Sequence, residues 1–111
     1  MIERINRQGV VDLIGKPESA VLVEALPEKY YNDAHIPGAV QMDYTEVTDK
    51  APSVLGDKDR KIVVYCASSE CENSTKAART LQQLGYDRIY VYKEGKQDWI
   101  EAGLRVESAG E

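Results

Sequence analysis

The centre of the chain reads Lys61-Ile-Val-Val-Tyr-Cys-Ala-Ser-Ser-Glu-Cys-Glu-Asn-Ser-Thr-Lys-Ala-Ala-Arg-Thr-Leu81. Its apolar, β-branched beginning at residues 62–65 predicts a buried strand. A polar loop follows, and it contains both cysteines of the chain. A helix is expected from Asn73 or Ser74, because apolar residues recur at helical spacing until Gly85 ends the pattern.

This order of strand, loop and helix makes the first cysteine of the loop a candidate for chemistry. With this order, backbone N–H groups and the positive end of the helix dipole point at the loop, where they stabilise an anion. Cys66 follows the strand directly, and the thiolate is the reactive form of a cysteine. The alternative is that Cys66 is a small buried apolar residue at the strand end. The local pattern leaves both interpretations open.

Composition limits the classes of protein to consider. The chain has 111 residues, of which 42% are hydrophobic and 30% charged, and this balance predicts one folded domain over residues 1–111. The formal net charge of -5 argues against nucleic acid or an anionic membrane as the main partner. The apolar runs are too short to span a bilayer. The start Met1-Ile-Glu-Arg4 lacks the features of an export signal, so both cysteines are expected to be thiols in the cytoplasm.

A metal site is not expected. The two cysteines and the one histidine could supply three ligands. However, the spacing of Cys66 and Cys71 and their distance along the chain from His35 match no common zinc pattern.

Helices and strands are predicted to alternate along the rest of the chain. Helices are expected over residues 2–16, 27–32 and 97–102, and strands over residues 20–25, 39–42 and 88–92. The segment at 43–59 is less regular, with a helical turn at 45–47 and a loop or short helix at 52–57. This alternation favours a three-layer α/β domain with a mainly parallel central sheet flanked by helices. In such sheets ligands bind beyond the C-terminal ends of the strands, and Cys66 is expected at such an end.

Four side chains outside the loop are expected to have structural roles. His35 precedes a Pro-Gly turn signal and is expected to bond the backbone rather than act as a general base. Glu24 ends a buried strand, so it needs partners or lies at the rim. Trp99 and Ile100 are expected on the inner side of the last helix, with Trp99 in the core.

Three segments of the chain, taken in order, resemble single-domain rhodaneses. Val21-Leu-Val-Glu-Ala25 followed by Tyr30-Tyr-Asn-Asp-Ala-His-Ile-Pro-Gly-Ala-Val40 resembles the family's first motif, which centres on His-Ile-Pro-Gly-Ala. Ile62-Val-Val-Tyr-Cys66 followed by Ser74-Thr-Lys-Ala-Ala-Arg-Thr-Leu81 resembles its active-loop strand and helix. Tyr92-Lys-Glu-Gly-Lys-Gln-Asp-Trp-Ile-Glu-Ala-Gly-Leu104 resembles its C-terminal motif, usually Gly-Gly-x-x-x-Trp. The ordered set covers nearly the whole chain and implies a rhodanese-like fold.

The resemblance implies a sulfurtransferase. In that family a loop cysteine, here Cys66, takes a sulfane sulfur from thiosulfate, polysulfide or a persulfide, holds it as a persulfide and passes it to a thiol acceptor. A partner protein is one option for donor or acceptor, and neither a metal nor an organic cofactor is implied. Loop N–H groups would cradle the persulfide. The expected cradle residues are Ala67, Ser68, Ser69, Glu70, Glu72, Asn73 and Ser74.

The loop departs from the family pattern in two ways. The serine that the family commonly places six positions after the cysteine is Ser74 here, eight positions after Cys66, and Asn73 replaces the arginine that usually precedes it. The loop also contains Glu70 and Glu72 but no Lys or Arg. A cation would bind thiosulfate and lower the thiol pKa, whereas carboxylates that point inward do the reverse. We therefore expect a persulfide or polysulfide donor, with the two glutamates forming a solvated rim.

Cys71, on the same loop as Cys66, has several interpretations. It is a resolving thiol or a redox switch that closes a disulfide, or it takes the sulfur on. The alternative is a loop cysteine that packs into the core.

Glu24 stands where the family often has an aspartate, and Leu26 stands where the family often has the arginine that pairs with it; we interpret Glu24 as structural. Two other functions compete with sulfur transfer. One is a non-catalytic rhodanese-like module that binds a protein partner. The other is an arsenate reductase or phosphatase, which needs an arginine to clamp a tetrahedral anion and is ranked last because the loop has none.

Overall fold

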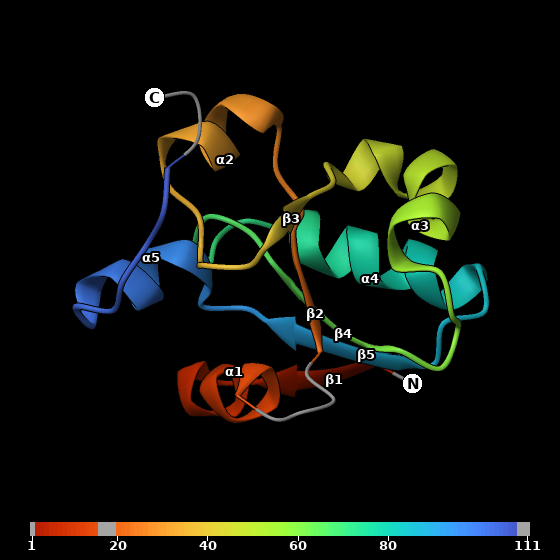
Figure 1. Cartoon of the computed structure of the whole chain (residues 1–111), viewed down its shortest axis with the longest axis horizontal. Helices are drawn as coiled ribbons and strands as arrows, with labels where there is room; N and C mark the ends of the chain where they lie inside the picture. The colour runs from red at the N-terminus through yellow and green to blue at the C-terminus, as the bar shows by residue number, and fades with distance from the viewer. Residues whose placement is uncertain (1, 16–19, 109–111) are drawn as a thin grey trace.

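The computed structural model describes residues 2–15 and 20–108 of the chain. In these residues five strands form one sheet in the order β1-β5-β4-β2-β3, and every neighbouring pair is parallel (Figure 1). The strands are β1 (Ile2–Ile5), β2 (Val21–Glu24), β3 (Val40–Gln41), β4 (Lys61–Tyr65) and β5 (Arg88–Tyr92). The expected α/β class with a mainly parallel sheet is confirmed.

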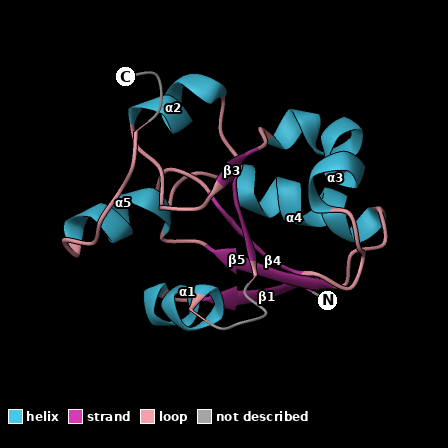
Figure 2. Cartoon of the chain, viewed as in Figure 1, coloured by secondary structure: helices cyan, strands magenta, loops and turns pink. Residues whose placement is uncertain are grey.

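Helices cover both faces of the sheet (Figure 2). They are α1 (Arg7–Ile14), α2 (Glu28–Asp33), α3 (Val47–Leu55), α4 (Asn73–Gln83) and α5 (Gly95–Glu101), with a 3-10 turn, η1, at Tyr44–Glu46. Helices α3 and α4 contribute to one core cluster, and α1 and α5 contribute to the cluster on the other face. The three layers expected from the sequence are therefore present.

The middle strand β4 is buried on both faces. Ile62 and Val64 pack in the cluster with α3 and α4, whereas Val63 and Tyr65 pack in the cluster with α1 and α5. Successive side chains of a strand point to opposite faces, so a strand covered on both sides must be apolar throughout. Burying each aliphatic side chain contributes about 1.5–3 kcal/mol relative to exposing it. This burial explains why the run of apolar residues before Cys66 predicted its strand correctly.

The prediction of one helix over residues 2–16 is wrong in its first part. Residues 2–5 form β1, an edge strand that pairs with β5 with Ile2 opposite Ile89 and Ile5 opposite Tyr92. The helix begins only after Asn6, whose side chain accepts a hydrogen bond from the Gly9 N–H at 2.9 Å. The spacing of the two isoleucines suits a helix as well as a short strand, and the pairing partner lies at the other end of the chain. Residue 16 lies outside the described residues.

The segment at 43–59 is more helical than predicted. The expected turn at 45–47 corresponds to η1, but α3 then continues through Pro52. Val47, Ala51 and Leu55 form one buried stripe at helical spacing. The burial of this stripe outweighs the hydrogen bond that Pro52 cannot donate.

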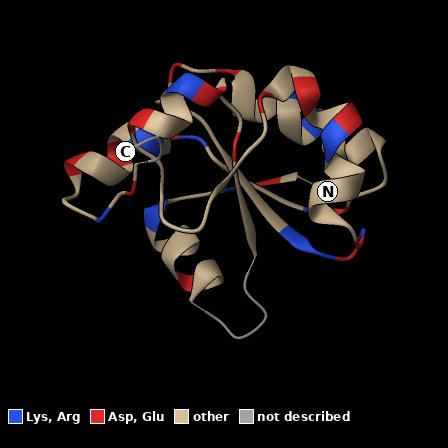
Figure 3. Cartoon of the chain, turned by 45° about the horizontal axis from the view of Figure 1, so that its top comes forward, with Lys and Arg blue, Asp and Glu red and all other residues tan. Residues whose placement is uncertain are grey.

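The remaining expected elements are confirmed within one or two residues. In α5, Trp99 is buried as predicted and donates from Nε1 to the Arg105 carbonyl at 2.8 Å. The prediction for Ile100 is wrong, because its side chain is 47% exposed. In the described part of the chain, none of the helices has the length and apolar character needed to cross a bilayer. Figure 3 shows that basic and acidic positions are interspersed along the ribbon.

Candidate active site

Cys66 lies at the C-terminal end of β4, beneath its own loop. Its side chain is fully buried. Its thiol donates a hydrogen bond to the Cys71 carbonyl, with Sγ 3.4 Å from the oxygen, and Sγ lies 3.6 Å from the hydroxyl oxygen of Ser74. Ser74, in the first turn of α4, is also fully buried. The sulfur therefore lies between a carbonyl acceptor of the loop and the beginning of a helix, where the sequence predicted it.

The pKa of the Cys66 thiol is raised above its ordinary value. Burial is the largest cause, because a thiolate loses hydration inside the protein, and a hydrogen bond with the Cys71 side chain raises the pKa further. The hydroxyl and the backbone N–H of Ser74 act in the opposite direction, since both can donate to a thiolate. The resting group at neutral pH is therefore the thiol.

The beginning of α5 packs directly against the beginning of the Cys66 loop. The Lys96 N–H donates to the Cys66 carbonyl and the Gln97 N–H donates to the Ala67 carbonyl, both at 2.8 Å. Gly95 has φ +71°, and a Cβ on it would lie 2.5 Å from the Cys66 carbonyl oxygen. Because C=O and N–H point in opposite directions across a trans peptide, the N–H groups of Ala67 and Ser68 point away from α5.

The loop has no basic residue of its own, but Lys93 supplies one from the end of β5. Its ammonium group donates to the carbonyls of Ser69 and Cys71, both at 2.8 Å, and lies 3.5 Å from a carboxylate oxygen of Glu72. The cation-free loop expected from the sequence is therefore corrected by the tertiary structure. Glu70 and Glu72 are exposed and form a solvated rim, as expected.

Glu24 is fully buried and has two strong partners. It accepts hydrogen bonds from the Tyr65 hydroxyl at 2.7 Å and from the Lys96 ammonium at 3.0 Å. Burial and the adjacent Glu24 carboxylate raise the pKa of Tyr65 far above its usual range. The Lys96 ammonium also donates to the carbonyls of Tyr30 and Ala34, at 3.0 and 2.6 Å. This network joins β2, β4, α2 and α5 directly below the loop, which supports the structural interpretation of Glu24.

His35 is a structural residue, as predicted. Its Nδ1 lies 2.9 Å from the Tyr31 carbonyl, and its ring stacks on the Tyr31 ring with centroids 3.8 Å apart. Its backbone forms an antiparallel bridge with Glu107, which attaches the C-terminal segment. These contacts give His35 a role in packing and backbone pairing, and none of them involves Cys66.

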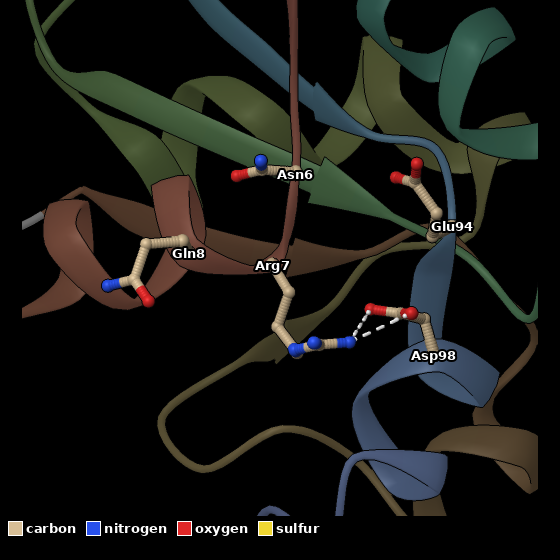
Figure 4. Close-up of a pocket in the computed structure, with 5 residues that line it drawn as sticks. All are labelled: Asn6, Arg7, Gln8, Glu94 and Asp98. Atoms are coloured by element: carbon tan, nitrogen blue, oxygen red, sulfur yellow. Dashed lines mark hydrogen bonds and ion pairs between the residues drawn. The ribbon is translucent and has the colours of Figure 1, made fainter.

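Among the described residues, two hollows are lined in part by α5. One, of about 420 Å³, adjoins the Cys66 loop and is lined by Ala67, Ser68, Lys96, Gln97, Ile100 and Glu101. The exposed Ile100 therefore faces an apolar hollow next to the candidate nucleophile. The other hollow, of about 180 Å³, contains an ion pair in which Nη1 of Arg7 lies 3.0 and 2.9 Å from the two carboxylate oxygens of Asp98 (Figure 4). Glu94 also lines it, with Oε1 buried and unpartnered, but none of its described lining residues belongs to the Cys66 loop, so it is the weaker candidate for a site that uses Cys66.

Sequence reasoning missed four residues that contact the loop. They are Lys93, Gly95, Lys96 and Gln97, and all follow β5. The register of β4 against β5 is what brings these residues to the loop. Tyr65 of β4 lies opposite Tyr92 of β5, so the residues that follow the two strands leave the sheet side by side. The order of strands that creates this pairing is not visible in the sequence.

Comparison with known proteins gives a consistent result. The family described as Rhodanese-like domain matches residues 6–102. The chain is 30% identical over 111 residues to the HTH-type transcriptional regulator Rv0324 of Mycobacterium tuberculosis, covering 86% of this chain and 48% of that protein. It is 29% identical over 98 residues to the putative sulfur carrier protein YrkF of Bacillus subtilis, covering 88% of this chain and 51% of that protein. The chain thus spans about half the length of these curated relatives.

Solved structures share the fold. The Alr3790 protein from Anabaena superposes with a TM-score of 0.84 at 27% identity, covering 95% of this chain and 80% of that chain. A rhodanese with anions from E. coli superposes with a TM-score of 0.69 at 20% identity, covering 82% of this chain and 100% of that chain. The rhodanese-like architecture expected from the sequence is confirmed.

Proposed function

The chain belongs to the rhodanese-like domain family, and from that premise we propose that residues 1–111 form one such domain, which acts as a sulfurtransferase through Cys66. The general link to sulfur transfer also has support from the resemblance to a putative sulfur carrier protein. The proposed setting is a reducing cytoplasm, and both cysteines are free thiols in the structure. The activity, its substrates and its protein partners are all part of the proposal.

The proposed reaction has two steps. The Cys66 thiol first loses its proton, and the thiolate attacks the outer sulfur of the donor. A sulfur–sulfur bond forms on Cys66 while the donor's sulfur–sulfur bond breaks, which releases a thiolate from a persulfide or sulfite from thiosulfate. An acceptor thiolate then attacks the outer sulfur of the persulfide, and Cys66 leaves as a thiolate. One sulfane sulfur moves in each step, so the pair of steps needs no external oxidant.

The observation that carries this proposal is the environment of the Cys66 sulfur. Sγ lies 3.6 Å from the buried Ser74 hydroxyl at the start of α4. The hydroxyl and N–H of Ser74 are donors that favour a negatively charged sulfur, and the start of a helix adds about 0.3–1 kcal/mol for a negative charge. A persulfide anion extending from Cys66 would meet further N–H groups of the loop. The proposed cradle comprises Ala67, Ser68, Ser69, Glu70, Glu72, Asn73 and Ser74.

The proposed donor is a persulfide or polysulfide rather than thiosulfate. An ammonium group has three N–H donors, and Lys93 directs its own at Ser69, Cys71 and Glu72. Two of its donors are thus held by loop carbonyls and the third faces a carboxylate, which disfavours binding of a thiosulfate dianion. The exposed carboxylates of Glu70 and Glu72 further disfavour a doubly charged donor at the entrance.

The second loop thiol is proposed to discharge the persulfide. Cys71 is partly exposed and its carbonyl already contacts Cys66 Sγ, so the two residues meet across the loop. Attack of the Cys71 thiolate on the inner sulfur would form a Cys66–Cys71 disulfide and release hydrosulfide. Attack on the outer sulfur would instead move the persulfide to Cys71. Both routes conserve sulfur atoms and electrons.

Intact-protein mass spectrometry tests the proposal. The wild type, Cys66→Ser and Cys71→Ser proteins would each be incubated with thiosulfate and, separately, with polysulfide. We expect a cyanide-labile gain of one sulfur that is lost in Cys66→Ser and kept in Cys71→Ser, with higher loading from polysulfide. A gain that persists in Cys66→Ser would contradict the assignment of Cys66, and preferred loading from thiosulfate would contradict the proposed donor.

A non-catalytic protein-binding module is the second candidate function. The full burial and raised pKa of Cys66 favour it, because both reduce the amount of reactive thiolate at neutral pH. A relative named as a transcriptional regulator, about twice as long as the matched region, is consistent with a domain that works inside a larger protein. In this case folded wild-type protein would gain no sulfur from either donor, and Cys66→Ser would bind the same protein partner as the wild type.

A further inference from the structure

Lys93 occupies a position that the sheet register determines. Tyr65 at the end of β4 lies opposite Tyr92 at the end of β5. The chain continues from these residues into Cys66 on one strand and Lys93 on the other. The lysine is thus held beside the loop by the sheet itself, although it lies 27 positions after the cysteine in the sequence.

The contacts of Lys93 are made mainly with the loop backbone. Its side chain is only 18% exposed, and its ammonium group donates to the carbonyls of Ser69 and Cys71 at 2.8 Å each. The contact with the Glu72 carboxylate is longer, at 3.5 Å, and that side chain is 64% exposed. Exposed ion pairs of this kind contribute little, whereas hydrogen bonds from a charged donor to a carbonyl are stronger. The main effect of Lys93 is therefore on the loop backbone.

One of these carbonyls also contacts the candidate nucleophile. The Cys71 carbonyl oxygen accepts from the Lys93 ammonium and from the Cys66 thiol. A carbonyl oxygen has two lone pairs, so it can accept both donors at once. When the Cys66 proton leaves, this oxygen would face a negatively charged sulfur, and Lys93 keeps it hydrogen-bonded and reduces its effective negative charge.

The same contacts close the loop over the sulfur. Cys66 is fully buried although the residues around it in the loop are largely exposed. At its beginning the loop is fixed by α5, through the bonds to the Cys66 and Ala67 carbonyls. In its middle, Lys93 bridges the carbonyls of Ser69 and Cys71, which belong to a turn that the Cys71 N–H closes by donating to the Ser68 carbonyl at 3.0 Å.

We infer that Lys93 is a positioning residue that holds the loop closed over Cys66 and so protects a sulfur carried there from attack by small nucleophiles. Because two of its donors are held by loop carbonyls and the third faces Glu72, it acts on the site through the loop backbone rather than by binding a substrate. The protective role rests on the proposed function, whereas the closure of the loop does not.

Two measurements on Lys93→Met and Lys93→Arg test loop closure and protection of the sulfur separately. The first is backbone amide hydrogen exchange over residues 67–74, which requires no sulfur chemistry. The second is the rate at which cyanide removes sulfur from protein preloaded with polysulfide, in a Cys71→Ser background so that the second thiol does not interfere. Lys50→Met is the matched control, since it makes the same substitution at a lysine of α3 that pairs with Glu46 at 3.1 Å, outside the Cys66 loop.

We expect Lys93→Met to increase both rates by about tenfold, which corresponds to a shift of about 1.4 kcal/mol in the opening of the loop. Lys93→Arg and Lys50→Met should stay close to the wild type, and thermal unfolding should show that all variants are folded. Unchanged amide exchange in Lys93→Met would overturn the inference, as would an arginine variant that opens like the methionine variant. If amide exchange is faster in Lys93→Met but the wild type gains no sulfur from polysulfide, the inference that Lys93 closes the loop stands. The proposed sulfurtransferase function is then contradicted instead.

Discussion

Gly95 and Cys66 are in direct backbone contact, although they belong to different elements of the fold. A Cβ on Gly95 would lie 2.5 Å from the Cys66 carbonyl oxygen and 3.0 Å from the Ser68 nitrogen. Real Cβ atoms do not approach backbone so closely, so only glycine lets α5 begin against the loop. Its φ of +71° is an additional requirement, because other residues rarely adopt this conformation.

Replacing this glycine should displace the loop. We expect Gly95→Ala to lower the free energy of unfolding by about 1–2 kcal/mol for the left-handed conformation and by about 1–3 kcal/mol more for the overpacked contact. Sulfur loading at Cys66 should fall at the same time. Chemical denaturation and intact mass would measure the two effects. Gly103→Ala is a matched control, since Gly103 has φ +79° and open space around it; equal losses in both variants would show that the contact itself has no effect.

The reactivity of Cys66 should increase as the pH rises. Its thiol pKa is raised, mainly by burial, so the thiolate forms only in alkaline solution. In a Cys71→Ser background, iodoacetamide should react with Cys66 along a pH profile whose midpoint lies above that of an ordinary cysteine. The raised pKa also makes the free energy of unfolding depend on pH. The contribution of the Cys66 thiol is fully present below its unfolded-state pKa and is lost as the pH rises through its folded-state pKa.

Ser74 should move that profile in a known direction. Its hydroxyl lowers the pKa of Cys66, so Ser74→Ala should shift the midpoint to higher pH. Ser69→Ala is the control, because this serine is exposed and its carbonyl, not its hydroxyl, contacts the site. A midpoint that does not move in Ser74→Ala would show that the hydroxyl does not stabilise the thiolate.

The ion pair of Glu24 and Lys96 should be strongly coupled. Lys96→Met would leave a fully buried carboxylate without its cation, and we expect a loss of about 3–5 kcal/mol in the free energy of unfolding. The double variant Glu24→Gln, Lys96→Met should recover part of this loss, because no buried charge then lacks a partner. Urea denaturation of the two single variants and the double variant forms a double-mutant cycle. If the two single losses simply add, the pair is not coupled.

Cys71 should shorten the lifetime of a persulfide on Cys66. After brief loading with polysulfide and removal of the donor, the wild type should release sulfide as a disulfide forms and should end two hydrogen masses below the unloaded, reduced protein. Cys71→Ser should retain the added sulfur for at least several-fold longer. Intact mass and sulfide release would follow both proteins over time. Equal lifetimes in the two proteins would indicate that Cys71 does not reach the Cys66 sulfur.

The local sequence predicted the element that carries the candidate nucleophile. Residues 62–65 are apolar throughout because β4 is covered on both faces, and Gly85, which has φ +103°, follows the end of α4. Cys66 at the end of this strand, and the ordered motifs around it, were sufficient to predict the α/β class and the family. These features depend on side-chain types at fixed spacing, and such patterns are contained in one stretch of chain.

Other elements depended on partners that are distant in sequence. Residues 2–5 form a strand only because β5 pairs with them, and α3 continues through Pro52 only because its buried stripe packs in the core. Sequence patterns in these segments favour helix and loop about as well as the observed structure. Burial and strand pairing, which involve the whole chain, resolve the ambiguity.

The positively charged groups at the candidate site belong to residues that are distant from Cys66 in the sequence. The loop around Cys66 contains two glutamates and no cation in its sequence, which predicted an acidic site. The parallel register of β4 and β5 brings Lys93 to the loop carbonyls, and α5 brings Lys96 to the buried Glu24. The sequence thus determined which residue carries the sulfur chemistry we propose, because that depends on local chemistry. The tertiary structure determined which cations surround it, because strand order and register decide which distant side chains meet.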